Sequence, residues 1–210
     1  MTSSLRERKK QATRLALHEA ALRLVAERGL DGVSVDDIAA GADVSPRTFF
    51  NYFSSKDDAL IGSGPPRPTE DAQRVFVAGG PTGDLLDDLK ALVMSPMLDF
   101  DRAEIARAFE QVRLRKRLVQ REPRFAHRIM AAFGAIEENV TNAVAARLGD
   151  DPDDIRPQVI ASLAITAMRF ATRRLHSREG GDHDRDGVRA VFDQVFDALR
   201  TTFETTRPEL

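Results

Sequence analysis

Hydrophobic residues recur every three or four positions along most of the chain, which is the period of an α-helix and not of a strand. The first such segment, residues 13–28, contains neither glycine nor proline. Gly29 follows it, and glycine is the residue that most often ends a helix in a left-handed conformation. The pattern predicts an all-α fold whose first helix ends at Arg28.

Two short helices are predicted next, from their capping residues. Ser34 precedes an apolar strip and has Asp37 three positions later, which is the spacing of a capping box. Ser45 is placed as a second N-cap, with Pro46 at the first helical position, where its missing N–H costs nothing. The two helices are therefore separated by a tight turn.

The second short helix, 46–53, carries more aromatic and polar side chains than it can bury. Phe49 and Phe53 lie four residues apart and are expected to face inward as core anchors. The remaining side chains point elsewhere, and a helix-turn-helix placed in the major groove of DNA explains such a face. These remaining residues are Arg47, Thr48, Phe50, Asn51 and Tyr52.

Residues 10–60 resemble the DNA-binding domain of the TetR family of bacterial one-component repressors. The family's usual turn, Ala-Gly-Val-Ser, here has Asp43 in place of glycine, and aspartate tolerates a positive φ better than most residues. The matching pieces are 20–25, Gly29, 34–39, 44–45, 48–50, 52–53 and 55–56.

The resemblance and the exposed face together assign DNA-contact roles. We expect Arg47 to read a base edge such as guanine, Phe50 to contact a thymine methyl or a sugar, and Asn51 to reach a base or a phosphate. The basic arm Arg6, Arg8, Lys9 and Lys10 is placed to touch phosphates. The complete predicted DNA-binding set is Ser34, Val35, Ser45, Arg47, Thr48, Phe50, Asn51, Tyr52 and Lys56.

Two proline- and glycine-rich stretches, 62–69 and 78–83, interrupt the helical pattern. They predict that a fourth helix stops near Ile61 and that a separate piece begins about Thr69. We therefore divide the chain into a helix-turn-helix domain at 1–56, a broken connecting helix and linker at 57–83, and a helical ligand-binding and dimerisation domain at 84–210. Helices are expected at 84–100, 103–121, 123–148, 155–176 and 188–203.

The last two predicted helices have wide apolar faces. Their apolar surface is larger than a single protomer of this length is expected to bury. A two-fold dimer would bury them. In TetR-like proteins the last two helices pack against their symmetry mates, so the resemblance implies the same homodimer. A dimer also supplies the two recognition helices that read a palindromic operator.

Residues 110–123 and 143–149 resemble the TetR subgroup of mycofactocin-type regulators, whose C-terminal domain is described as binding acyl-CoA-like ligands. This resemblance implies an apolar tunnel for a lipophilic chain and a cation for an acidic head group. Plain core packing and a solvated helix face are the alternative roles for the same side chains. The candidates are Met94, Met97, Phe100, Phe109, Arg113, Arg117, Phe133 and Met168.

Composition narrows the function. The chain has no cysteine, which excludes thiol catalysis and thiolate metal sites, and its four histidines have no partners at triad or metal-ligand spacing. We expect no enzyme activity, no cofactor, no metal and no membrane span, and a cytoplasmic location. Residues 1–60 carry nine basic and nine acidic side chains, so DNA affinity depends on where the charges lie.

The sequence thus predicts a transcriptional regulator, a repressor that a small lipophilic effector releases from double-stranded palindromic operator DNA. Two alternatives stay open. One is an activator of the same fold. The other is a helical protein that sequesters a ligand and binds DNA only weakly, which the neutral N-terminal domain and Asp43 would suit.

Overall fold

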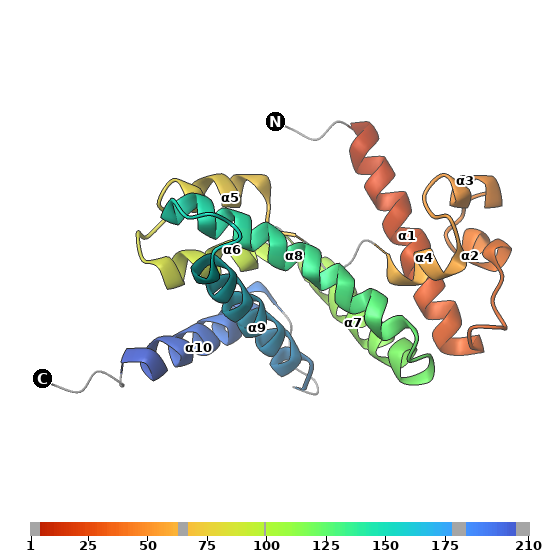
Figure 1. Ribbon diagram of the computed structural model, residues 1–210. Helices are drawn as coiled ribbons and strands as arrows, with labels where there is room; N and C mark the ends of the chain where they lie inside the picture. The colour runs from red at the N-terminus through yellow and green to blue at the C-terminus, as the bar shows by residue number, and fades with distance from the viewer. Residues whose placement is uncertain (1–4, 63–66, 99, 178–183, 205–210) are drawn as a thin grey trace, which may run out of the picture. The chain divides into compact units, whose positions relative to one another are not determined.

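The computed structural model describes residues 5–62, 67–98, 100–177 and 184–204, and within this part it consists of ten α-helices and no strand (Figure 1). The expected all-α fold is confirmed. The helices are α1 Leu5–Arg28, α2 Val35–Gly41, α3 Pro46–Phe50, α4 Lys56–Ile61, α5 Glu70–Val77, α6 Leu85–Leu98, α7 Arg102–Arg121, α8 Phe125–Leu148, α9 Ile155–Ser177 and α10 Arg185–Glu204.

Contacts between residues group the chain into two compact units. The first unit comprises residues 1–64 and 108–132, and the second comprises 65–107 and 133–210. Helices α7 and α8 each contribute one part to the first unit and the other part to the second. The helices α2 and α3, which the sequence predicts to bind DNA, therefore share a compact unit with a segment that lies far beyond them in the sequence.

The first unit is built around α1, which contacts α2 and α4, while α2 contacts α3. The inward stripe of α1 is buried as its spacing predicts, with Leu17 and Ala21 fully covered. Ile38 of α2, Phe49 of α3 and Leu60 of α4 complete this core, each with no exposed surface. Helix α1 starts at Leu5, earlier than predicted, and ends before Gly29, whose φ is 77°.

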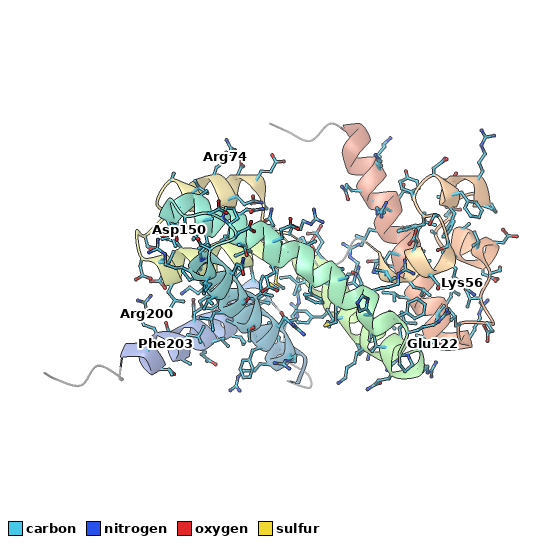
Figure 2. The ribbon with its side chains drawn as sticks, in the orientation of Figure 1. Lys56, Arg74, Glu122, Asp150, Arg200 and Phe203 are labelled. Carbon is cyan, nitrogen blue, oxygen red and sulfur yellow. The ribbon has the colours of Figure 1, made fainter. Side chains whose placement is uncertain are left out.

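The segment 108–132, which we call the α7–α8 corner, comprises the later part of α7, the turn after it and the beginning of α8. It is tied to α1 by side chains. The Gln111 amide donates to the Glu19 carboxylate at 2.9 Å, and the Arg121 guanidinium donates to the carbonyl of Ala26 at 2.9 Å. The turn carries Glu122, which is labelled in Figure 2.

The second unit has α6 at its centre, in contact with α5, α9 and α10, and α9 packs on α10. Its core consists of the apolar stripes of these helices. Phe76 of α5, Leu92 of α6, Phe192 and Phe196 of α10 are all almost completely buried. The predicted break in the connecting helix is confirmed, because α4 ends at Ile61 and α5 begins at Glu70.

A buried ion pair fixes the loop between α5 and α6. The Asp88 carboxylate accepts hydrogen bonds from the backbone N–H and the hydroxyl of Thr82, at 3.0 and 2.8 Å, and from Arg147 at 2.7 Å. Gly80 lies directly against this carboxylate with a φ of 74°, and a Cβ there would overlap it. The guanidinium of Arg147 also lies over the Phe76 ring, 4.7 Å from its centroid.

A second set of ion pairs joins α6 to α10. Arg200, labelled in Figure 2, binds Asp84 at 2.8 Å and Asp87 at 3.0 Å, and Lys90 binds Asp193 at 2.9 Å. Hydrogen bonds from Arg200 are the main reason that the pKa of Asp84 is far below its ordinary value. Among the helices of the described residues, none has both the length and the apolar character needed to cross a membrane.

Candidate nucleic-acid interface

The helix α2 begins with the capping box that the sequence predicts. The Asp37 N–H donates to Ser34 Oγ at 3.1 Å, and the Ser34 N–H donates back to Asp37 Oδ2 at 2.8 Å. The Ser34 hydroxyl also donates to Asp37 Oδ2, and this bond, followed by the one from the Ser34 N–H, lowers the pKa of Asp37 because both favour the ionised carboxylate. Ser34 is exposed and Val35 is half-buried. The predicted phosphate contact of Ser34 stays a prediction, since in this structure its side chain caps α2.

The turn between α2 and α3 holds Asp43 in the left-handed region, with a φ of 55°. It is the one non-glycine residue with a positive φ in the described part of the chain. The Val44 N–H donates to the carbonyl of Ala39 at 3.0 Å, and the Asp43 N–H donates to that of Ala40 at 3.1 Å. The predicted tolerance of aspartate at this position is confirmed.

Helix α3 is capped as its sequence indicates, but it ends at Phe50 with Asn51 as its C-cap, so the predicted helix over 46–53 is three residues too long. The Thr48 N–H donates to Ser45 Oγ at 3.1 Å, and Pro46 occupies the first turn. Phe49 is fully buried and Phe53 is almost so, with their ring centroids 5.9 Å apart. The two predicted core anchors are therefore confirmed.

The opposite face of α3 is open to solvent. Arg47 and Asn51 are exposed, and Phe50 retains 58 % of its surface although it is a large apolar side chain. The Phe50 ring meets Phe49 edge-on, with 5.4 Å between the centroids, so it stands on the core without entering it. Three predicted base-contacting residues thus share one accessible surface.

An arginine from α1 holds the end of α3. The Arg14 guanidinium donates to the carbonyl of Tyr52 at 2.9 Å and lies 4.5 Å from the centroid of the Phe53 ring. Thr48 and Tyr52 are half-buried. This interaction fixes the orientation of α3 on the first unit, and such fixed positioning is what a base-reading helix requires.

Lys56 has a structural role that sequence reasoning missed. Its ammonium group donates to the carbonyls of Leu30 and Val33, at 2.6 and 2.7 Å, and so joins the start of α4 to the loop after α1 (Figure 2). These two bonds use two of its three N–H groups. No short-range pattern in the sequence signals them. The predicted phosphate contact of Lys56 stays a prediction for the remaining N–H.

The basic arm is only partly described. Lys9 and Lys10 are exposed on the first turns of α1, where the expected phosphate contacts are sterically open. The side chains of Arg6 and Arg8 lie outside the described residues. The helix itself extends back to Leu5, so the arm begins as helix rather than as an extended strand of chain.

The candidate ligand-binding residues are divided between the two compact units. Phe109, Arg113 and Arg117 belong to the first unit, whereas the other five belong to the second. Arg113 is exposed and binds Glu110 on its own helix, and Met94 is buried. Met97, Phe100, Met168 and Phe133 are half-buried, and Arg169 lies over the ring of Phe133 at 5.3 Å. Their ligand roles stay predictions.

A cavity of about 460 Å³ lies between α9 and α10, and none of the eight candidates lines it. Its walls are mainly apolar. Sequence reasoning marked the apolar faces of both helices but did not predict a hollow between them. It is lined by Leu163, Thr166, Ala167, Phe170, Arg174, Gln194, Val195, Ala198, Leu199 and Thr202.

The outer face of the same helices is apolar and uncovered in the protomer. Ile155 is 80 % exposed, and Val159, Leu163 and Phe170 of α9 are each about half exposed. Phe203, labelled in Figure 2, is 65 % exposed on the last turn of α10. In the part of the chain that the structure describes, no group of three or more His, Asp or Glu side chains is placed to hold a metal ion.

Comparison with known proteins finds a matching family model for each of two parts of the chain. The model of the tetR family of bacterial regulatory proteins matches residues 17–61, and that of the MftR C-terminal domain matches residues 84–204. The transcriptional regulator TcmR of Streptomyces glaucescens is 28 % identical over 206 residues, covering 93 % of this chain and 86 % of TcmR. The mycofactocin biosynthesis regulator MftR of Mycobacterium tuberculosis is 30 % identical over 156 residues, covering 73 % and 75 %.

Solved structures share the fold at low identity. A TetR-family regulator from a Rhodococcus species matches with a TM-score of 0.55 and 18 % identity, covering 91 % of this chain and 98 % of the other. One from Mesorhizobium loti matches with a TM-score of 0.54 and 14 % identity, covering 93 % and 98 %. The chain therefore belongs to the TetR family, with an MftR-type C-terminal domain, and is a DNA-binding transcriptional regulator rather than an enzyme.

Proposed function

We propose that the protein acts as a homodimeric repressor that binds a palindromic operator through α3 of each protomer and is released by a small lipophilic effector. The observation that carries the DNA-binding part is that Arg47 and Phe50 of α3 and Asn51 at its C-cap are exposed, while Phe49 and Phe53 anchor the same segment in the core. Exposing a phenylalanine to water is unfavourable, so its presence beside a cation and an amide points to a partner surface.

Each side chain of this group has a matching chemical partner in the major groove. The Arg47 guanidinium suits the two acceptors of guanine, and Phe50 suits a thymine methyl or a sugar edge. Asn51 suits an adenine or a phosphate. Ser45, Thr48, Tyr52 and Lys9 can donate hydrogen bonds to phosphates, which set the register of the helix without reading sequence.

The proposal of a homodimer is supported by the uncovered apolar face of α9 and by Phe203 on α10. Apolar surface of this kind is costly to leave in water, and a second copy of the same face is the simplest cover. Two α3 helices would then be related by a two-fold axis, and the operator would share that symmetry.

The proposal of a lipophilic effector, including an acyl-CoA-like one, rests on the match of residues 84–204 to the MftR C-terminal domain. One local arrangement agrees with it. The Phe133 ring under the Arg169 guanidinium joins an apolar wall to a cation, the combination that an acyl chain with an acidic head group requires.

Selection of bound DNA from a random duplex library tests the operator and the roles of the side chains. Arg47→Ala should relax base preference at one position of each half-site, with a loss of about 1–3 kcal/mol on the preferred base. Lys10→Ala should weaken all sequences equally and reduce the salt slope by about one. Equal, sequence-independent losses from both substitutions would rule out a reading role for Arg47.

The oligomeric state is tested separately, by light scattering on the eluted protein. Leu163→Arg places a charge on the exposed face of α9 and should convert dimers to monomers. Val75→Arg is the matched control, since Val75 is similarly exposed on α5. A wild-type protein that stays monomeric at micromolar concentration, or a dimer that both variants leave intact, would contradict this interface.

A further inference from the structure

Helix α4 does not continue into the second unit. It ends at Ile61, and Gly62 follows it with a φ of 65° and a ψ of −153°, a conformation that terminates a helix. The next helix begins at Glu70. A signal from the C-terminal helices therefore has no single rigid helix along which to reach the DNA-binding helices through α4.

A chain of side-chain contacts instead connects α8 to Ser54, the residue after the buried Phe53. The Arg128 guanidinium donates to Asp58 Oδ1 at 2.8 Å. The other oxygen, Asp58 Oδ2, accepts hydrogen bonds from the backbone N–H and the hydroxyl of Ser54. Ser54 directly follows Phe53. Asp58 therefore joins the first turns of α8 to the segment between α3 and α4.

A second ion pair reinforces the same contact. Arg124, in the turn before α8, lies 3.6 Å from the Asp57 carboxylate. Asp57 and Asp58 are consecutive residues in the first turn of α4, so two arginines of the α7–α8 corner hold two neighbouring carboxylates. These two ion pairs fix the position of the first turn of α4 relative to the α7–α8 corner.

A second chain of contacts starts on α7 and ends on the last turn of α4. The Arg115 guanidinium donates to His18 Nε2 at 2.8 Å, and the buried His18 ring donates through Nδ1 to the carbonyl of Ala59 at 2.7 Å. This assignment follows because an arginine always donates, which leaves Nε2 as the acceptor and Nδ1 as the protonated nitrogen. Gly62 lies against the same ring, and a Cβ there would overlap it.

We propose that the α7–α8 corner positions the α3–α4 segment through two side-chain relays, Arg128–Asp58–Ser54 and Arg115–His18–Ala59. Helices α7 and α8, which each supply residues to both units, are then the route by which C-terminal events reach the DNA-reading face. Arg128 and Arg115 are positioning residues, since they act through Asp58 and His18. The consequence for operator affinity rests on the proposed function, whereas the positioning itself does not.

The solvent exposure of the first relay makes it testable without unfolding the protein. The side chains of Arg128 and Asp58 are 46 % and 37 % exposed. Exposed ion pairs contribute little to global stability, so removing one changes local opening more than it changes the folded fraction.

Hydrogen exchange measured by mass spectrometry on the full-length protein tests the relay without an effector or an operator. Arg128→Ala and Asp58→Asn should each raise amide exchange in residues 51–58 by about threefold, the size expected for an exposed ion pair. The double variant should show no more than the larger single effect, because both substitutions break one chain of contacts. Arg113→Ala is the control, since its partner Glu110 lies on the same helix.

Two results would overturn the proposal. One is unchanged exchange in residues 51–58 of Arg128→Ala, and the other is an equal rise in the Arg113→Ala control. A rise spread uniformly over α1, α2 and α4 would also count against it, because that pattern indicates general destabilisation rather than positioning.

DNA binding gives the second readout and separates this inference from the proposed function. On an operator selected by the wild-type protein, Arg128→Ala should weaken binding about threefold with the same base preference. If the wild-type protein selects no DNA while the exchange result holds, the proposed function fails and the relay stands. If DNA is bound and neither exchange nor affinity responds to Arg128→Ala, the relay is wrong.

Discussion

The two compact units each bury one ionisable side chain beside an arginine, and they treat its charge in opposite ways. In the first unit, His18 is 3 % exposed. Its ring forms hydrogen bonds with the carbonyl of Ala59 and the guanidinium of Arg115. Burial, helped by the nearby charges of Arg115 and Arg14, lowers its pKa to about 4, so the ring is neutral at pH 7.

In the second unit, the buried group is charged. Burial acts to raise the pKa of Asp88, but hydrogen bonds from Thr82 and the ion pair with Arg147 outweigh it, and the pKa lies below its ordinary value. The side chain of Asp88 has no exposed surface and that of Arg147 is 10 % exposed. One unit therefore keeps its buried histidine neutral, and the other keeps its buried carboxylate charged and pairs it with an opposite charge.

This difference gives the units different sensitivities. When a buried histidine stays neutral, the stability of the folded state decreases as the pH falls, because the unfolded chain binds a proton that the folded chain does not bind. The stability that a buried ion pair contributes does not change under mildly acidic conditions, but removing one partner leaves an uncompensated charge in the interior. The first unit should therefore respond to mild acid, and the second to substitution.

The largest effect is expected from Asp88→Ala. It leaves the Arg147 charge without its partner inside the second unit, which typically costs about 3–5 kcal/mol of unfolding free energy. Denaturant unfolding followed by circular dichroism measures the loss.

Asp71→Ala is the matched control for this substitution. Asp71 also pairs with an arginine in the second unit, Arg74, but both side chains are more than 70 % exposed, and the expected loss is below about 0.5 kcal/mol. Similar losses for the two variants would erase the distinction between buried and exposed pairs on which the comparison depends.

The next effect is the pH dependence of the first unit. Because the pKa of His18 is about 4 in the folded chain and its ordinary value is 6.5, stability from this group is fully present above pH 6.5 and declines as the pH falls toward 4. At 1.36 kcal/mol per unit, the loss by pH 5 is about 2 kcal/mol. Chemical denaturation of wild type and His18→Gln at pH 7 and pH 5 measures it.

Only the change with pH is diagnostic here, since His18→Gln also has a cost of its own. The variant should lose about 2 kcal/mol less between pH 7 and pH 5 than the wild type. His127→Gln, on the exposed surface of α8, should keep the wild-type slope. An identical slope in all three proteins would show that the pKa of His18 is the same in the folded and the unfolded chain.

A smaller effect is expected when the neighbouring cation is removed. Arg115→Met takes away the second-largest cause of the lowered histidine pKa, after burial itself. The pKa of His18 should rise above about 4 while staying below its ordinary value, as followed by NMR titration of the imidazole protons. Arg117→Met, exposed on the same helix, should leave that titration in place.

The smallest effect concerns the turn between α2 and α3. Asp43→Gly relieves a positive φ but makes the unfolded chain more flexible, so thermal unfolding should change by only a few tenths of a kcal/mol. A change as large as that of Asp88→Ala would mean that this turn matters as much to the stability of the first unit as the buried ion pair does to that of the second.

The sequence allowed the recognition segment to be predicted because its features are local. The Ser34–Asp37 capping box, the Ser45 cap and the inward pair Phe49 and Phe53 depend on spacings of three or four residues. Helix geometry alone relates residues at such distances, so the pattern and the structure agree.

Features that depend on distant partners could not be predicted in this way. Lys56 binds carbonyls 26 and 23 residues away, and His18 binds one 41 residues away. The same limit applies to the candidate ligand residues. Periodicity showed that Phe109 and Met168 were apolar and inward on their helices, but it gave no information that they belong to different compact units.

Asp43 places an exposed anion in the turn before α3, where one mutation can remove it. Aspartate and glycine codons differ by a single base, so one nucleotide change would remove both an exposed anion and a left-handed side-chain conformation next to α3. Because the turn keeps its backbone hydrogen bonds with either residue, the fold would tolerate the exchange. Under the proposed function, this single change should give a regulator that binds operator DNA more tightly.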